Sequence, residues 1–210
     1  MNEEQAVLDF FANPENLQLT LRVAELADTL RQEYNNRFWR SLHAHVGAAA
    51  PEWSCTLTED RQAPGNLIGL SLTPSLGQEI FLRPFLEQQV MGGTPRIYGG
   101  LMWSVPPSPE QNTLPAVAAL RETLQTLGYK QSETFPAWRW SLWHPRRRDF
   151  LLQFAKQPEA LTIAAGEELL SIVTRHRALL DAAHTALAES PRSATISLAQ
   201  LRSNPGKSSD

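Results

Sequence analysis

The chain contains a single cysteine, Cys55, among its 210 residues. One cysteine excludes a disulfide within the chain, and it excludes zinc or iron–sulfur sites that need several thiolates. Lysine is scarce as well, with Lys130, Lys156 and Lys207 as the three examples. Arginine supplies the rest of the positive charge, and it favours planar contacts with carboxylates and phosphates and stacks on rings. The same arginine bias is also typical of a GC-rich genome.

Long apolar runs and a basic excess are missing too. No run approaches the ~20 residues of a membrane-spanning helix, and the first residues, Met1-Asn2-Glu3-Glu4, are acidic, unlike a signal peptide. We therefore expect a cytoplasmic protein with no membrane contact. The formal net charge is −3 and the pI about 6.0, so the chain as a whole is not a basic nucleic-acid binder. Any contact with nucleic acid needs a local basic patch.

Apolar residues recur every three or four positions over residues 15–46, which predicts a long helix. One face of this helix is lined by Val23, Ala27, Leu30, Tyr34, Phe38, Leu42 and Val46. Further helices are predicted at residues 4–12, 110–127 and 166–189, and a short helix or strand at 149–157. Gly47 and Gly128 are natural C-terminal stops for the helices that they follow.

The apolar period changes to two between residues 52 and 105, which is typical of strands with one apolar face. Strands are predicted at residues 53–58, 68–73, 79–88 and 96–105, and a fifth at 138–144. Short turns rich in proline and glycine separate the first four, so we expect an antiparallel meander.

These elements predict an α+β fold for residues 1–190, taken as a single domain. The fold is an antiparallel meander of about five strands, with the long N- and C-terminal helices packed on one face. Residues 191–210 are rich in serine, proline and glycine, and we expect them to form a flexible tail.

Three tryptophans and four arginines lie within the Trp/Arg segment, Trp138–Arg148. Tryptophan and arginine dominate the binding energy of protein interfaces, while arginines beside an exposed ring also suit phosphates and bases. The candidate partner-binding residues are Arg139, Trp143, Arg146, Arg147 and Arg148. In the third interpretation, Trp138 and Trp140 are ordinary core on the inner face of the sheet, and the arginines are solvated at a strand end.

Other chemistries have weak sequence support. No nucleophile elbow, P-loop or dinucleotide fingerprint is present. His43 and His45 lie two apart on a helix and point to opposite sides, so they do not share a metal. Asp60 and Glu87 fall at predicted strand ends, where carboxylates can hold Mg²⁺ or simply be solvated. We predict no catalytic residue, no metal site and no cofactor.

One resemblance emerges from the assembled elements. The long helix ends in Tyr34-Asn35-Asn36-Arg37-Phe38-Trp39-Arg40-Ser41-Leu42, strands follow, and Leu127-Gly128-Tyr129 precedes a Trp-rich strand. This order resembles the C-terminal, non-catalytic region of PD-(D/E)XK superfamily nucleases of bacterial defence and mobile elements, over about residues 5–190. Such nucleases use an Asp and a Glu-x-Lys to hold Mg²⁺ and activate water. No acidic residue stands two before any lysine of this chain, so the resemblance implies recognition or regulation.

The sequence therefore favours a non-catalytic module that binds a partner protein through the Trp/Arg segment, within a bacterial defence or toxin-control system. A nucleic-acid-binding accessory module that uses the same residues is the alternative. A degenerate metal-dependent nuclease that uses Asp60 and Glu87 is the second alternative.

Overall fold

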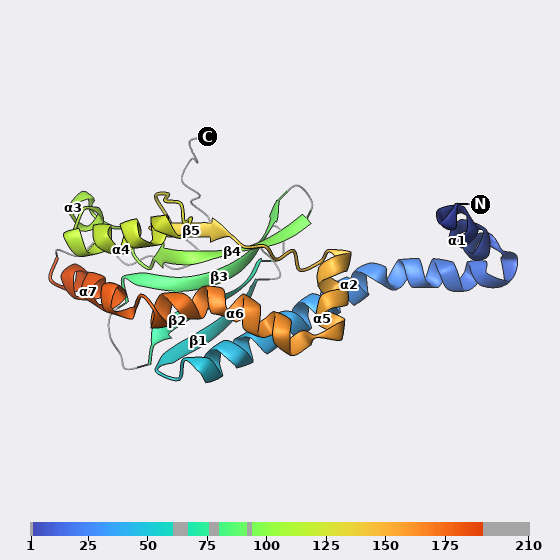
Figure 1. Cartoon of the computed structure of the whole chain (residues 1–210), viewed down its shortest axis with the longest axis horizontal. Coiled ribbons are helices and arrows are strands. Elements are labelled where there is room, and N and C mark those ends of the chain that lie inside the picture. The colour runs from blue at the N-terminus through green and yellow to red at the C-terminus, as the bar shows by residue number, and fades with distance from the viewer. Residues whose placement is uncertain (1, 61–66, 76–79, 92–93, 191–210) are drawn as a thin grey trace.

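The computed structural model describes residues 2–60, 67–75, 80–91 and 94–190 (Figure 1). The helices are α1 (Glu3–Ala12), α2 (Pro14–Ala49), α3 (Pro109–Asn112), α4 (Pro115–Thr126), α5 (Arg148–Lys156), α6 (Pro158–Thr174) and α7 (Arg177–Ala188). The strands are β1 (Trp53–Asp60), β2 (Leu67–Pro74), β3 (Leu82–Met91), β4 (Thr94–Trp103) and β5 (Ala137–Trp140). The predicted tail, 191–210, lies outside the described residues.

The five strands form one sheet in the order β1-β2-β3-β4-β5, and every neighbouring pair is antiparallel. The predicted meander and the α+β class are therefore confirmed. Gly100 has φ +151° and pairs with Trp138 across the β4–β5 ladder. A Cβ at this position would collide with the Ala137 carbonyl, so glycine is what lets β5 approach β4.

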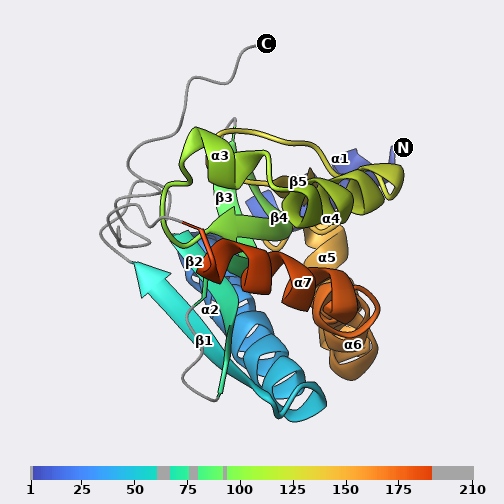
Figure 2. The ribbon, with the colours of Figure 1, turned by 90° about the vertical axis from the view of Figure 1, so that its left-hand side faces the viewer.

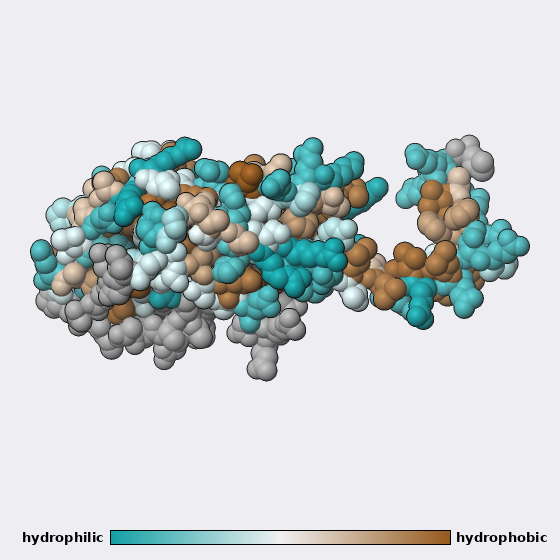
Figure 3. All heavy atoms as spheres, turned by 90° about the horizontal axis from the view of Figure 1, so that it is seen from below, coloured by the Kyte–Doolittle hydropathy of each residue, from teal (hydrophilic) through white to brown (hydrophobic). Residues whose placement is uncertain are grey.

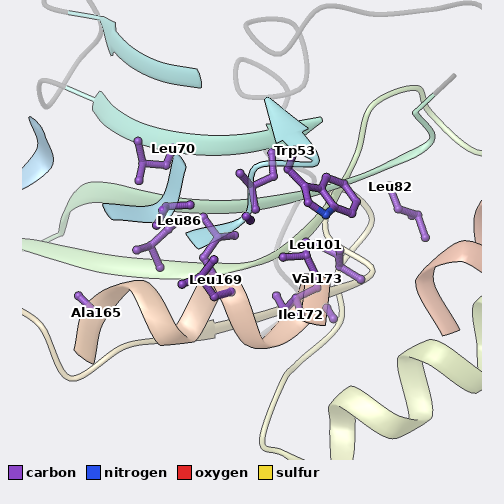
Figure 4. Close-up of a cluster of buried hydrophobic side chains, with 14 of the residues drawn as sticks. Trp53, Leu70, Leu82, Leu86, Leu101, Ala165, Leu169, Ile172 and Val173 are labelled. Carbon is purple, nitrogen blue, oxygen red and sulfur yellow. The ribbon is translucent and has the colours of Figure 1, made fainter. Parts of the chain in front are cut away.

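Helices cover one face of this sheet. Alternate residues of β4, namely Ile97, Leu101 and Trp103, join the main core with side chains of α2, α4, α6 and α7. Figure 2 shows α2, α6 and α7 on the same side of the sheet. In Figure 4, Leu169 and Val173 of α6 point toward the strands that carry Leu86 and Leu101. The period of two in the strands thus supplies the apolar face that these helices bury.

Several boundaries differ from the prediction. The helix predicted at 110–127 is two helices, because Pro115 lacks the N–H that would continue α3 and instead begins α4. The helix predicted at 166–189 begins earlier, at Pro158, and breaks between Arg175 and His176. The fifth strand ends at Trp140 instead of His144. The short segment at 149–157 is helical, as α5.

The N-terminal part of α2 projects away from the rest of the molecule, which we call the body (Figure 1). The first buried residue of this 36-residue helix is Asn35. Of the predicted apolar stripe, Val23 and Leu30 are therefore exposed, whereas Phe38, Leu42 and Val46 are buried in the core. The reason is the length of α2, whose N-terminal part extends beyond the sheet and the helices that cover it (Figure 1).

Candidate functional site

The Trp/Arg segment begins as the edge strand β5 and then leaves the sheet. Ser141 fixes the point where the segment leaves the sheet, because its backbone N–H and its hydroxyl both donate to the Ile97 carbonyl, each at 3.0 Å. The Ile97 N–H in turn donates to the Trp143 carbonyl at 3.1 Å. The backbone of the segment is therefore fixed against β4 as far as Trp143.

The half-buried side chain of Arg139 contacts other parts of the chain. Its Nη1 donates to the Leu127 carbonyl at 2.9 Å, at the C-terminal end of α4, where a positive charge is favourable. Its guanidinium also lies 4.6 Å from the centroid of the Tyr129 ring. Burial raises the pKa of Glu168, and the nearby Arg139 works in the opposite direction. Arg139 therefore stabilises the contact between β5, α4 and α6.

Trp143 is half-buried and packs against the main core. Its backbone N–H donates a hydrogen bond to the Ser141 hydroxyl oxygen at 3.0 Å. The nearby indole lowers the pKa of the Glu168 carboxylate, against the larger effect of burial. Trp143 thus packs the segment against the main core, with part of its ring left accessible.

The three consecutive arginines differ in their surroundings. Arg146 is 29% exposed, and its Nη2 lies 3.5 Å from Asp28 Oδ1 on the projecting part of α2. Arg147 and Arg148 are exposed at the start of α5, and neither makes an ion pair within the residues that the structure describes. Burial, with Arg147 and Arg96 nearby, lowers the pKa of His144. The positive charge at the C-terminal end of the Trp/Arg segment therefore comes from its arginines.

Trp138 and Trp140 lie on the face of the sheet opposite to the main core. They belong to a second cluster of buried or half-buried side chains from β3, β4, β5 and the preceding loop: Phe85, Tyr98, Met102, Phe135, Trp138 and Trp140. Arg96 stacks over the Trp140 ring, 5.0 Å from its centroid. The expectation that these tryptophans fill the inner face, beneath the helices, is therefore wrong. Strand alternation sends them to the other side from Ala137, which joins the main core.

The two residues of the nuclease hypothesis do not lie on neighbouring strands. Glu87 is buried and accepts a hydrogen bond of 2.6 Å from the Tyr98 hydroxyl. Asp60 belongs to β1 and pairs with Leu67 of β2, so a whole strand separates it from β3. Two strand spacings amount to about 9–10 Å. Across the described part of the chain, no three His, Cys, Asp or Glu side chains come together as a metal site.

A further surface emerges that the sequence interpretation missed, and we call it the arm (residues 3–33: α1 and the projecting part of α2). Two contacts hold α1 to α2: Asn16 Nδ2 donates to the Phe10 carbonyl at 2.9 Å, and the Thr20 hydroxyl donates to the Phe11 carbonyl at 3.4 Å. The arm exposes ten large apolar side chains: Val7, Leu8, Phe10, Phe11, Leu17, Leu19, Leu21, Val23, Leu26 and Leu30. Figure 3 shows their brown atoms along α2 and on α1.

The arm is also acidic. Seven carboxylates against Arg22 and Arg31 give it a formal charge of −5, which leaves +2 on the remainder of a chain whose total is −3. The charge of this segment can be counted in the sequence, although the composition of the whole chain hides it. The exposure of its apolar residues depends on the fold, because the sequence does not show where α2 leaves the body.

No family model, curated protein or solved structure matches the chain. Among the residues that the structure describes, no helix combines the length and the apolar character needed to cross a membrane.

Proposed function

We propose that this protein is a non-catalytic interaction module that binds a partner protein, and that the arm is its docking element. The supporting observation is the exposed apolar surface of the arm. At about 60–120 Å² for a Val or Leu side chain and about 200 Å² for Phe, the ten residues leave on the order of 600 Å² accessible, spread over both helices. The largest apolar patch of a typical monomer is about 300–600 Å² and is often an interaction site. An exposed apolar surface of this size favours binding to another protein.

The acidic charge of the arm narrows the class of partner. A formal charge of −5 repels phosphates and anionic lipid headgroups, because like charges raise the energy of approach. A partner with an apolar groove or helix face, rimmed by neutral or basic side chains, fits best. The resemblance to the non-catalytic region of PD-(D/E)XK nucleases extends the proposal to an accessory subunit in the bacterial cytoplasm, within a defence or toxin-control system.

The test compares the full chain with a variant that carries Val23→Glu and Leu26→Glu. Both side chains are exposed, so the fold should be retained while the apolar stripe is broken. The wild-type chain, used as bait at its native abundance, should retain a protein that the variant loses. A control with Leu127→Glu and Ile163→Glu places the same charge on exposed apolar positions of the body and should retain it. Equal retention by the arm variant would remove the proposal.

Nucleic acid stays a second candidate because Arg147 and Arg148 are exposed and close together. Arg139 and Arg146 are engaged within the chain, at Leu127 and Asp28 respectively. Two phosphate contacts predict a slope of about −1.8 for log affinity against log salt on duplex DNA. An electrophoretic shift assay at 50 and 200 mM salt measures this slope. Absence of a shift at both salt concentrations would eliminate the candidate.

A further inference from the structure

The most exposed apolar side chains of the arm form a stripe with a symmetrical spacing. Leu19, Val23, Leu26 and Leu30 are 54–67% exposed. They follow one another by four, three and four residues, so at about 100° per residue they fall within about 60° of the helix circumference. This stripe lies roughly opposite to the face of α2 that carries Asn35, Leu42 and Val46 into the body. It is the 3-4 spacing of a helix–helix seam.

The spacing of the stripe is four, three and four residues, and it is the same when read from either end of the helix. When two such helices run antiparallel about a point between Ala24 and Glu25, Leu19 of one copy meets Leu30 of the other, and Val23 meets Leu26. The positions that flank this seam carry small or uncharged side chains apart from Arg22. In this register Thr20 faces Ala27 and Arg22 faces Thr29, so no like charges meet across the seam.

The apolar area of the whole arm approaches what a stable dimer needs. A standard interface buries about 800 Å² on each partner, of which about 65% is apolar in homodimers, and the exposed apolar side chains of the arm supply on the order of 600 Å². A helix that is apolar on two opposite sides is normally buried on both. Leu17 and Leu21 face away from the stripe, so pairing of the two α2 helices along the stripe does not cover them.

Charge favours the antiparallel orientation over the parallel one. α1 carries Glu3, Glu4 and Asp9 and no basic residue. In a parallel pair the two acidic tips lie together. In the antiparallel pair, the second copy's Pro14, where α1 joins α2, lies level with Asn35. Phe150 and Phe154 of α5 pack on Phe38 and Tyr34, near that level. The exposed Arg147 and Arg148, at the start of α5, then lie toward an acidic tip.

We infer that the arm binds the arm of a second copy of this chain, as an antiparallel pair along Leu19, Val23, Leu26 and Leu30. This inference rests on the proposed function, because it names the occupant of the same docking element. The Trp/Arg segment then acts at the rim, where Arg147 and Arg148 contact the acidic tip of the second copy. The seam supplies the affinity, and the arginines supply the orientation.

Sedimentation velocity of the full chain between 1 and 100 µM tests the pairing. The wild-type chain should sediment as a dimer whose fraction rises with concentration. The variant with Val23→Glu and Leu26→Glu should be monomeric throughout with an unchanged circular dichroism spectrum, because the pair would place four carboxylates in one seam. The control with Leu127→Glu and Ile163→Glu should stay dimeric.

A wild-type chain that is monomeric at 100 µM overturns the inference. The proposed function is separate from this outcome, since a monomer that still retains another protein through the arm keeps it. A chain that dimerises equally well with the two seam glutamates also overturns the inference, because the contact then lies elsewhere.

The orientation is tested by disulfide trapping in a Cys55→Ala background. Leu19→Cys and Leu30→Cys are prepared as separate proteins. In the antiparallel register the two cysteines face each other, so covalent dimers should form when the proteins are mixed and should be at least tenfold fewer with either protein alone. Covalent dimers of each protein alone in equal yield would indicate a parallel pair and contradict the orientation.

The role of the arginines is tested by Arg147→Glu with Arg148→Glu. At 50 mM salt the dimer dissociation constant should rise severalfold, and at 500 mM salt the difference should shrink, because the Debye length falls to a few ångströms. Arg175→Glu with Arg177→Glu is the matched control on the body. A dissociation constant that is unchanged at low salt would remove the arginines from the interface.

Discussion

The junction between the arm and the body contains two buried polar side chains, Trp39 and Asn35, that differ in their hydrogen bonding. The Trp39 indole N–H donates to Gln88 Oε1 at 3.0 Å, which joins α2 to β3. Asn35, one helical turn earlier, has no exposed surface, and neither its side-chain nitrogen nor its oxygen has a hydrogen-bond partner among the described residues. A buried polar group without a partner carries its full desolvation cost.

Asn35→Leu should therefore raise the free energy of unfolding by about 1–3 kcal/mol, since it removes the buried amide while keeping the shape. Chemical denaturation followed by circular dichroism measures the change. Asn36→Leu is the neighbouring control, because Asn36 is half-buried and its amide accepts from Gln32 at 3.0 Å. A loss of stability in Asn35→Leu would show that the amide has polar partners that stabilise it.

Cys55 is half-buried on β1, and burial raises the pKa of its thiol from 9.0 to about 11. Because the thiolate is the reactive form, two pH units correspond to about a hundredfold less thiolate at pH 8. Reaction with a disulfide reagent at pH 8 should thus be about a hundredfold slower in the folded chain than in denaturant. Equal rates would contradict the burial of this thiol.

At the scale of the elements, Gly100 and Gly128 both have positive φ but different surroundings. Gly128 has φ +84° after α4, and a Cβ there meets nothing within 4 Å. A Cβ on Gly100 collides with the backbone of β5. Gly128→Ala should cost about 1–2 kcal/mol from backbone strain, and Gly100→Ala about 3–5 kcal/mol from strain plus overpacking. Urea denaturation measures both, and similar costs would contradict the close approach of β4 and β5.

The strands and the long helices could be predicted because each has one simple period. The break at Arg175 and His176 could not, because Leu169, Val173 and Leu180 keep a continuous helical register across it and no proline or glycine marks it. The role of Arg139 at the end of α4 depends on the pairing of β5 with β4. Such a contact joins segments that sequence patterns treat separately.

The whole molecule combines a body with a conventional core and an arm without one. The arm could not be predicted from the sequence, because its apolar residues keep a helical spacing and only the fold shows that this part of α2 extends past the body. The partner-binding role of Arg139, Trp143, Arg146, Arg147 and Arg148 stays a prediction. The structure assigns internal contacts to Arg139, Trp143 and Arg146, and it leaves Arg147 and Arg148 accessible.

Hydrogen exchange of the full chain at 1 and 100 µM tests most directly whether a second copy covers the arm. A two-helix projection without further packing opens easily, so its amides exchange quickly. Pairing should slow exchange over residues 17–30 at the higher concentration, by at least tenfold, while exchange in β3 and β4 stays unchanged. Rapid exchange over residues 17–30 at both concentrations would contradict the account.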